Sequence, residues 1–464
     1  MDIDRQTLER LDEMDIADPA FRRSCDGHAL ISQIGGERAT QGPGNKIVTT
    51  PDHVHVVWQD SLECRYFARA RSLDRQSGRW SPSVTLAEGV DEHSRPTMTI
   101  DGSGILHVVM GGHNSPLQYR HSLHADSTAD WSEIESFGKN TYPVILCGSD
   151  DTLYLTARNG DHTGLELWLR PRNSAWTRGG VLMARGPEHT GYLGLSNCAA
   201  WGPDHRTIHL SAGFFEGQAL DPDSGDHARD VAGTHQAVGY MRSDAGFGEA
   251  TSSWQKADGT PVDIPATSQS VDLLEEGHGR SPKPGILHGG LAVDSRGYAT
   301  VAWVRHTPRP CDPHLARVTE EDVWSPLPIR QAIEREWPGW GAVGLVPGHG
   351  PDDALHVLVT IVEIEHPAAN WNPGVYGLPT FWLRELPGLN RLVWLTSRDC
   401  GASFQAREAV AYDPKRPALM PSIERPTGFP VRLDHGPSFL YTVGESRYAD
   451  EGETINNDVF WAER

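Results

Sequence analysis

Two histidines, two tyrosines and an arginine lie at matching points of three successive stretches of the sequence. His93 and His113 stand in DEHSRPTMTIDGSGILHVVMGGHNSPLQYRHS, Tyr142 and Arg158 in TYPVILCGSDDTLYLTARNGDH, and Tyr192 at the start of the next stretch, GYLGLSNCAAWG. Imidazole and phenol groups can take up and return a proton, and a guanidinium can neutralise a carboxylate. Together these residue types indicate acid–base chemistry on an anionic substrate.

Each of these residues also has a structural role when it is taken alone. A histidine at a strand end commonly bonds the backbone, Arg158 could pair with Asp161 inside the fold, and Tyr142 could serve packing. The whole set, at matching positions, favours a site.

The elements that must position these residues are repeated strands. The phrase ILHVVMGGH at residues 105–113 recurs as HVHVVWQD, TLYLTARNG, TIHLSAGFFE, YATVAWVRH, ALHVLVTIVE and SFLYTVGE. Repeats of roughly 40–55 residues, each a few strands long, are typical of radial β-architectures. Seven units predict an all-β, seven-bladed β-propeller, in which matching positions of successive blades meet at one central opening.

The predicted domain organisation is an N-terminal helical extension at residues 1–26 and a propeller at residues 27–464. Leu8, Leu11 and Met14 have the spacing of a short amphipathic helix. Wider gaps between repeats, from about residue 208 to 300 and from 355 to 440, are rich in Gly, Pro and polar residues. They predict long loops, which either carry binding residues or decorate the rim.

The net charge of −21 limits the partners that the protein can have. An acidic surface repels nucleic acid and anionic membranes, so neither is expected as a partner. An acidic oligosaccharide would need a local positive pocket. The sequence leaves a monomer and a small homo-oligomer equally open.

Six scattered cysteines show no Cys-x-x-Cys pair, which is typical of reduced, intracellular proteins. The N-terminus is acidic and lacks an apolar segment, and no stretch is long and apolar enough to span a membrane. These features predict a cytoplasmic location.

The segment SRDCGASF at Ser397–Phe404 resembles the Asp-box of sialidases and related propellers. In such a box the Asp and Ser side chains bond their own backbone and lock a hairpin turn. The motif therefore supports the fold and says little about chemistry.

Residues 88–217 resemble the BNR-repeat propeller lyases, notably the ulvan lyases, through the phrases GGHNSPLQYRHS and TYP…LYLTARNG. The C-terminal half matches only through its repeated strands. The resemblance implies a seven-bladed propeller that cleaves a uronic-acid-containing oligo- or polysaccharide by β-elimination. In that reaction a base removes the C5 proton beside a neutralised carboxylate, and an acid protonates the leaving oxygen.

Roles follow from this chemistry and the resemblance. Arg158 neutralises the carboxylate, and its positive charge stabilises a phenolate on Tyr142, the first candidate for base and acid. His113 is its partner or competitor, while His93 and Tyr192 orient the substrate. The predicted catalytic residues are Tyr142, His113, His93 and Arg158, and the predicted substrate-binding residues are Tyr192 and Asn114.

This scheme requires no cofactor and no metal. A structural zinc or calcium ion stays open, since Cys198 with nearby histidines could form a zinc site of the sort that some members of the family carry, although tight ligand spacing is absent. The histidines that alternate along strands read as structural residues: His53, His55, His107 and His209.

Two other functions remain open at this stage. A glycoside hydrolase on the same scaffold, rhamnosidase-like or sialidase-like, would use similar sugars, although no convincing arginine triad of a sialidase can be chosen. A non-catalytic sugar-binding propeller would need no converging His, Tyr and Arg. The sequence specifies neither the uronate and its neighbouring sugar nor endo versus exo cleavage.

Overall fold

The computed structural model describes residues 3–16, 27–42, 44–184, 193–216, 237–243, 253–276, 286–305, 311–364, 390–428, 436–445 and 452–463. Within these residues the chain folds into antiparallel β-sheets with two short helices, α1 (Arg5–Glu13) and α2 (Ile329–Glu336). Neither helix is long and apolar enough to cross a membrane.

The two largest sheets contain the N-terminal part of the chain. The first has nine strands: β28 (Ala418–Ile423), β29 (Phe439–Val443), β30 (Asn457–Ala462), β1 (Ala29–Gly35), β3 (His53–Leu62), β4 (Arg65–Asp74) and β5 (Arg79–Trp80) in order, with β2 (Ile47–Thr49) on β3 and β6 (Val84–Gly89) on β4. The second has seven, in the order β13 (Thr177–Ala184), β12 (Gly164–Arg170), β11 (Leu153–Asn159), β10 (Glu135–Cys147), β9 (Ser115–His121), β8 (Leu106–Met110) and β7 (Thr97–Ile100).

Three smaller sheets follow along the chain. One contains β14 (Leu193–Trp201), β15 (Ile208–Glu216), β16 (Ala237–Ser243), β17 (Trp254–Gln255) and β18 (Pro261–Val262), with β19 (Asp272–Glu276) on β16. The next contains β20 (Ile286–Val293), β21 (Ala299–Arg305), β22 (Asp312–Val318) and β23 (Trp324–Pro326). The last contains β24 (Trp340–His349), β25 (Leu355–Glu363), β26 (Asn390–Ser397) and β27 (Gln405–Glu408).

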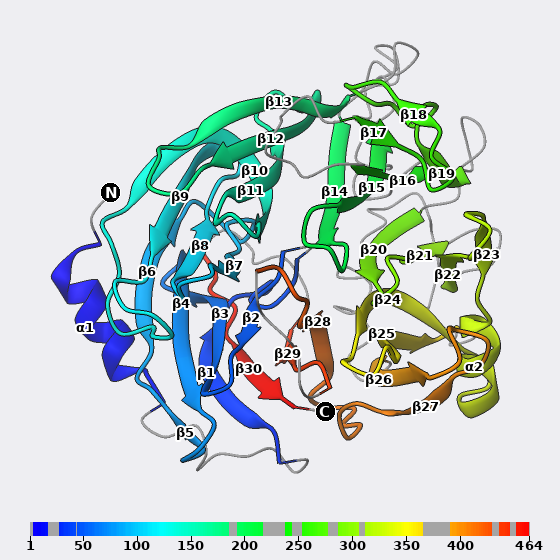
Figure 1. Cartoon of the computed structure of the whole chain (residues 1–464). Helices are drawn as coiled ribbons and strands as arrows, with labels where there is room; N and C mark the ends of the chain where they lie inside the picture. Colours follow the sequence, from blue (N-terminus) through cyan, green and yellow to red (C-terminus); the bar gives the residue numbers. More distant parts are fainter. Residues whose placement is uncertain are drawn as a thin grey trace, which may run out of the picture.

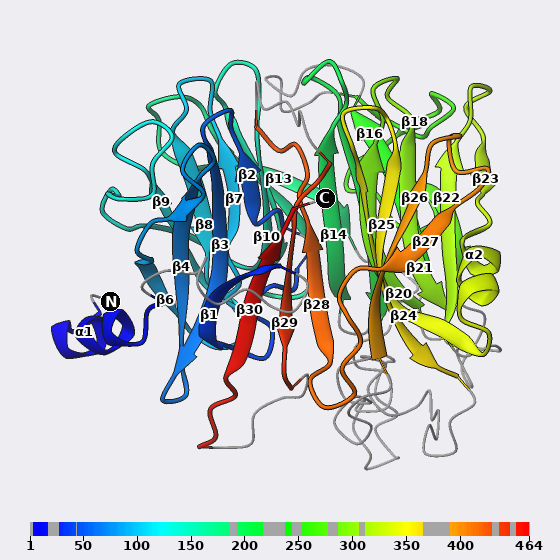
Figure 2. The ribbon, with the colours of Figure 1, turned by 90° about the horizontal axis from the view of Figure 1, so that it is seen from below.

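The repeated phrases of the sequence all form strands, namely β3, β8, β11, β15, β21, β25 and β29. Figure 1 shows the sheets arranged around a common centre, and Figure 2 shows the same strands from the side. The all-β prediction is therefore confirmed. The described strands form five hydrogen-bonded sheets, so the count of seven blades stays a prediction.

The two ends of the chain meet in the nine-stranded sheet. Strand β1 pairs antiparallel with β30, with Ala29 opposite Trp461 and Leu30 opposite Phe460. Residues from the start of the sequence thus complete a sheet made from its end (Figure 1). Such pairing protects strand edges that would otherwise be exposed.

The hydrophobic core lies between neighbouring sheets. Several strands are buried along their whole length, as in β8 and β11, because a neighbouring sheet covers each face. One cluster joins Val57 and Ala68 of the nine-stranded sheet to Met98 and Leu106 of the seven-stranded sheet. The apolar repeat that identified the strands is therefore the surface that packs the sheets together.

Helix α1 begins after Asp4, whose side chain accepts a hydrogen bond from the Thr7 backbone N–H at 2.9 Å. Leu11 packs with Ile34 and Phe67 against the first sheet. The predicted division at residue 26 lies outside the described residues and stays a prediction. Helix α2 has no counterpart among the elements predicted from the sequence; it buries Ile329, Ala332 and Ile333 at helical spacing.

The two wide gaps between repeats have different outcomes. Residues 217–236, 277–285 and 365–389 lie outside the described residues. Residues 257–276, in contrast, contain β18 and β19, so the expectation of a continuous long loop was wrong there. These strands are two to five residues long, too short for the periodicity to be recognised.

The turn at residues 397–404 joins β26 to β27. The Asp399 carboxylate accepts hydrogen bonds from the backbone N–H of Ser403 at 2.9 Å and from its hydroxyl at 2.5 Å. These bonds hold the pKa of Asp399 below its ordinary value, at about 2. The turn is thus locked by its own side chains.

Candidate active site

Tyr142 lies on an irregularity in strand β10. Thr141 pairs with Arg158 and Val144 with Thr156, so Tyr142 and Pro143 together oppose the single residue between those partners on β11. This is a β-bulge, which redirects a side chain. Tyr142 has a φ of +60°, uncommon for a residue other than glycine, and such outliers cluster at functional sites.

Asn114 lies in the turn between β8 and β9, which also contains Gly111 and Gly112. Both glycines have a φ of +81°, and a Cβ at Gly112 would lie 2.2 Å from the carbonyl oxygen of Asn140. Only glycine allows this approach, which brings the turn against the bend in β10. Asn114 itself has a φ of +56°, a conformation that asparagine tolerates.

A hydrogen-bond triangle connects this turn to β10 and β11. The Arg158 guanidinium donates to Asn114 Oδ1 at 3.2 Å and to Thr141 Oγ1 at 3.0 Å. Thr141 Oγ1 donates to the same Asn114 oxygen at 3.1 Å. A guanidinium can only donate hydrogen bonds, so the group that faces Arg158 must be the amide oxygen of Asn114. The amide NH₂ of Asn114 therefore points away from Arg158.

His93 and His113 stack with their ring centroids 4.0 Å apart. His113 Nδ1 lies 2.5 Å from one oxygen of Asp91, and His93 Nδ1 lies 3.3 Å from the other and 3.0 Å from Glu92. Burial opposes ionisation of Asp91, but the hydrogen bonds from His113 and His93 prevail and lower its pKa. An ionised Asp91 fixes the orientation and tautomer of His113 and leaves Nε2 for other contacts.

The structure brings together five of the six predicted residues: His93 from the segment between β6 and β7, His113 and Asn114 from the turn after β8, Tyr142 from within β10 and Arg158 from near the end of β11. The His93 and Tyr142 rings are 5.9 Å apart, and the Arg158 guanidinium carbon lies 5.0 Å from the Tyr142 ring centroid. The His113 side chain is 33% exposed, Tyr142 is half-buried, and Arg158 is 1% exposed. Arg158 therefore lies behind Tyr142 and Asn114. The predicted residue Tyr192 lies outside the described residues.

Sequence reasoning missed a second set of charged groups around Tyr142. The Arg95 guanidinium carbon also lies 5.0 Å from the phenol ring centroid, and Arg38 is close enough to lower the pKa of Arg95. Burial contributes most to that shift, to about 10, so Arg95 keeps its charge at neutral pH. Lys46 is fully buried nearby and donates to the carbonyl of Pro96 at 2.6 Å. Burial first, and then the charges of Arg95 and Arg425, lower the pKa of Lys46. The positive charge beside Tyr142 is therefore supplied by the guanidinium groups of Arg95 and Arg158.

The signal for these residues was present in the sequence. Arg95 stands two residues after His93 in the phrase DEHSRP, and Asp91 two residues before it. Arg38 and Lys46 precede strand β2, which corresponds in the chain to β7. A comparison of the charged residues that precede the first strand of each repeat would have identified these residues.

His162, in the turn between β11 and β12, lies near Arg158 and His113. Burial first, and then the positive charges of Arg158 and His113, lower the pKa of His162 to about 4. Its imidazole is therefore neutral at pH 7. It can exchange hydrogen bonds there but cannot neutralise a carboxylate.

The centre of the molecule is crossed by the segment that follows β28. The backbone N–H of Arg425 donates to Asn45 Oδ1 at 3.1 Å, and the carbonyl of Thr427 accepts from Cys147 N at 2.7 Å and from Trp201 Nε1 at 3.3 Å. Contacts to residues before β2, in β10 and in β14 tie separate sheets together at the middle. This bridge holds the elements of the candidate site in a fixed relation.

Cys198, where the sequence leaves a zinc site open, belongs to none of the groups of potential metal ligands found among the described residues. Its sulfur contacts the Arg425 guanidinium and the carbonyl of Leu291, neither of which is a zinc ligand in this setting. His107 and His209 are buried and bond Tyr119 and Tyr240 at 2.7 Å each, as structural residues would. His53 and His55, in contrast, share a carboxylate partner.

The comparisons with known proteins concern both sequence and fold. A family model described as BNR repeat-containing family member matches residues 55–332, more than half of the 464 residues. The ulvan lyase PL25 of Pseudoalteromonas sp. (strain PLSV) is 23% identical over 274 residues, which cover 51% of this chain and 54% of that protein. An ulvan lyase of Alteromonas sp. (strain LOR) is 23% identical over 252 residues, 50% of this chain and 48% of that protein. The chain thus aligns with about half the length of these curated relatives.

Solved structures show the same architecture over most of the chain. A PL25 ulvan lyase bound to -[GlcA(1-4)Rha3S]- matches with a TM-score of 0.66 at 13% identity and covers 94% of both chains. The polysaccharide lyase Uly1 matches with a TM-score of 0.54 at 12% identity and covers 90% of both chains. At these identities the likeness establishes the fold alone.

Proposed function

Because the chain belongs to the BNR repeat-containing family, and because its candidate site collects proton-transfer groups beside buried cations, we propose that it is a carbohydrate-active lyase. It cleaves a uronic-acid-containing oligo- or polysaccharide, of the rhamnose–glucuronate kind, by β-elimination. The observation that carries the proposal is that the guanidinium carbons of Arg95 and Arg158 each lie 5.0 Å from the Tyr142 ring centroid, with the His93–His113 pair beside the same ring.

Tyr142 is the proposed base and acid. A phenol removes a proton only when positive charge stabilises the phenolate, and two guanidinium groups at 5.0 Å from the ring supply that charge. The Tyr142 phenolate takes the C5 proton and becomes a neutral phenol, which then donates this proton to the oxygen of the leaving sugar, so the C4–O bond breaks as the C4=C5 bond forms. His113, oriented by Asp91, is the alternative donor or acceptor for either step.

Asn114 is the proposed contact for the uronate carboxylate. The amide oxygen of Asn114 is held inward by Arg158, so its NH₂ can donate to the carboxylate and to the enolate-like charge that develops there. Arg158 is 1% exposed, so we assign it a positioning role behind Asn114 and Tyr142 instead of the direct contact expected from the sequence. His93 supports the ring of His113, and Tyr192 keeps its predicted role in substrate binding.

The comparisons support this proposal in two ways. Both curated relatives are ulvan lyases, and each aligns with about half of this chain. A structure of the same fold binds a glucuronate–rhamnose saccharide, which supports an acidic sugar as substrate. No cofactor is part of the proposed reaction.

The test is incubation of the full chain with rhamnose–glucuronate oligosaccharides while absorbance of the 4,5-unsaturated uronate is followed. We expect new absorbance in step with new reducing ends. Reducing ends without that absorbance would indicate a rhamnosidase-like hydrolase and refute the lyase. Binding without either product would indicate a sugar-binding propeller.

Three further predictions accompany this function. We propose seven blades, with two blades in the nine-stranded sheet joined at the Gly35–Asp60 pair and two in the seven-stranded sheet sharing the long strand β10. We also propose the division at residue 26 and a cytoplasmic location, the latter from the cysteines. The five described cysteines, which include buried Cys147 and exposed Cys64, form no disulfide with one another.

A further inference from the structure

A second group of two imidazoles and one carboxylate lies away from the candidate active site. Among the described residues, two such groups have ligand atoms that all lie within 4.8 Å of one another: Asp91 with His93 and His113, and Asp126 with His53 and His55. His53 begins strand β3, and Gln59 of the same strand donates to the carbonyl of Asp91 at 3.2 Å. Six residues of strand span about 20 Å, so the two groups lie at opposite ends of β3.

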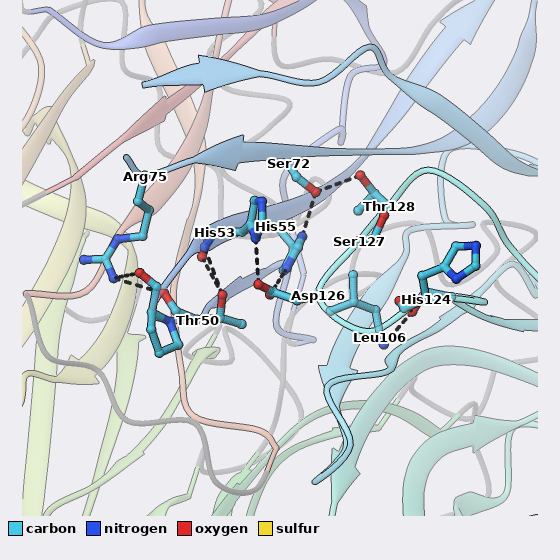
Figure 3. Close-up of polar contacts among 12 residues, drawn as sticks. Thr50, His53, His55, Ser72, Arg75, Leu106, His124, Asp126, Ser127 and Thr128 are labelled. Atoms are coloured by element: carbon cyan, nitrogen blue, oxygen red, sulfur yellow. Dashed lines mark hydrogen bonds and ion pairs between the residues drawn. The ribbon is translucent and has the colours of Figure 1, made fainter. Parts of the chain in front are cut away.

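The second group is built from two different sheets. His53 and His55 alternate along β3, so both imidazoles project from one face of the nine-stranded sheet. Asp126 lies in the connection between β9 and β10 of the seven-stranded sheet. Asp126 Oδ2 lies 2.6 Å from His53 Nδ1 and Oδ1 lies 2.8 Å from His55 Nε2, as Figure 3 shows.

The carboxylate is held firmly in this position. Asp126 has a φ of +55°, and its backbone N–H donates to the carbonyl of Gly104 at 2.8 Å. Burial opposes its ionisation, but hydrogen bonds from His55, His53 and Thr50 prevail and lower the pKa of Asp126. The two hydrogen bonds place the carboxylate between the two imidazoles.

His55 has the environment of a metal ligand. The side chain is fully buried, so its ring is held in one place between Asp126 and Ser72. His55 Nδ1 lies 2.7 Å from Ser72 Oγ, which lies 2.7 Å from Thr128 Oγ1 (Figure 3). Without an ion, Nε2–H donates to Asp126 and Ser72 donates to Nδ1. With an ion, Nε2 presents its lone pair, Nδ1–H donates to Ser72, and the hydroxyls rotate to suit.

We propose that His53 Nδ1, His55 Nε2 and the Asp126 carboxylate form a binding site for a first-row divalent cation, with zinc as the favoured ion, that cross-links the two largest sheets. Two imidazoles and one carboxylate suit zinc, whereas calcium prefers oxygen ligands only. Water completes the coordination on the open side, where His53 is 30% and Asp126 is 26% exposed.

Binding requires a local adjustment of the two imidazoles and the carboxylate, whose ligand atoms already lie within 4.8 Å of one another. Ligand atoms around tetrahedral zinc are about 3.3 Å apart, because each bond is about 2.0–2.1 Å long. The two histidine–carboxylate contacts of 2.6 and 2.8 Å must therefore open by roughly half an ångström. The partly exposed Asp126 and His53 can make this movement, while buried His55 stays in place.

The test uses the full chain freed of metal by dialysis against a chelator. Zinc ions are then added, bound metal is counted by mass spectrometry, and thermal unfolding is followed. We expect one ion bound at this site and a rise in Tm of roughly 2–6 °C, because the ion binds the folded state. Calcium added instead is expected to leave Tm unchanged.

Variants separate zinc bound at this site from zinc bound by the Asp91 group or by surface histidines. His53→Gln and Asp126→Asn should each bind one zinc ion fewer and lose the Tm rise. His124→Gln is the matched control, since His124 is 68% exposed in the same connection and lies apart from the two imidazoles in Figure 3. His124→Gln should bind as much zinc as the unchanged protein does. His113→Gln should also keep the zinc ion bound by His53, His55 and Asp126.

A second readout reports the ligands directly. Cobalt substituted at the site should give visible absorption bands of low-symmetry coordination, and His53→Gln should remove them. The proposal is overturned if the unchanged protein gains neither bound zinc nor Tm, or if His53→Gln keeps both. It is also overturned if only His113→Gln loses the ion. Each outcome is independent of whether the chain is a lyase.

Discussion

The two groups of two imidazoles and one carboxylate have the same composition and different surroundings. At the candidate active site the rings are stacked at 4.0 Å and lie beside Tyr142 and buried guanidinium groups. At the other end of β3 the rings are 5.6 Å apart, and the His55 ring contacts the hydroxyl of Ser72, which in turn contacts the hydroxyl of Thr128. Cations beside a phenol favour proton transfer, whereas hydroxyl partners favour orientation of a ligand. Two groups with the same imidazoles and carboxylate are therefore expected to differ in function because the residues around them differ.

The largest expected effect comes from the phenol, which only the candidate active site has. Tyr142→Phe should lower kcat for formation of unsaturated uronate by about 10²–10⁴-fold, because the proton-transfer group is lost while the ring still packs. Initial rates with oligosaccharide measure this change, and thermal unfolding provides the control. Activity within a factor of two of the unchanged protein would remove Tyr142 from the reaction.

The next effect separates the two carboxylates. Asp91→Asn should lower lyase activity by roughly 10–100-fold, because His113 loses the anion that orients it. Asp126→Asn should leave lyase activity within about twofold, since the two groups lie about 20 Å apart. Rates of both variants measured side by side provide the comparison. Equal losses in both would mean that the two groups act together.

The smallest effect concerns acid stability next to the candidate active site. The pKa of His162 is about 4 in the folded chain and near 6.5 when unfolded, so below pH 6.5 the unfolded state binds the extra proton. Its contribution to stability is complete above pH 6.5 and is lost as pH falls toward 4. His162→Gln should therefore flatten the fall in urea midpoint between pH 6.5 and 4. An NMR titration that placed the His162 pKa near 6.5 would contradict this.

The sequence predicted the architecture better than the site. The apolar repeat predicted the positions of β3, β8, β11 and their counterparts. Each of these strands packs between neighbouring sheets, so each repeat needs an apolar strand at the same place. It also placed His93, His113, Tyr142 and Arg158 together, since matching positions of repeats meet in space.

What the sequence did not predict depends on contacts between distant segments. The Asp126 turn meets β3 only through packing of two sheets, and the bulge that aims Tyr142 is a register shift invisible to periodicity. The burial of Arg158 likewise follows from the triangle with Asn114 and Thr141. Short strands such as β18 were missed because two residues carry no period.

The most direct measurement is a crystal structure of the Tyr142→Phe variant with a bound rhamnose–glucuronate oligosaccharide. We expect the uronate carboxylate within hydrogen-bond distance of Asn114 Nδ2, and C5 facing residue 142 on the side of His113. A uronate bound elsewhere, or one whose C5 faces away from residue 142, would contradict the proposed elimination.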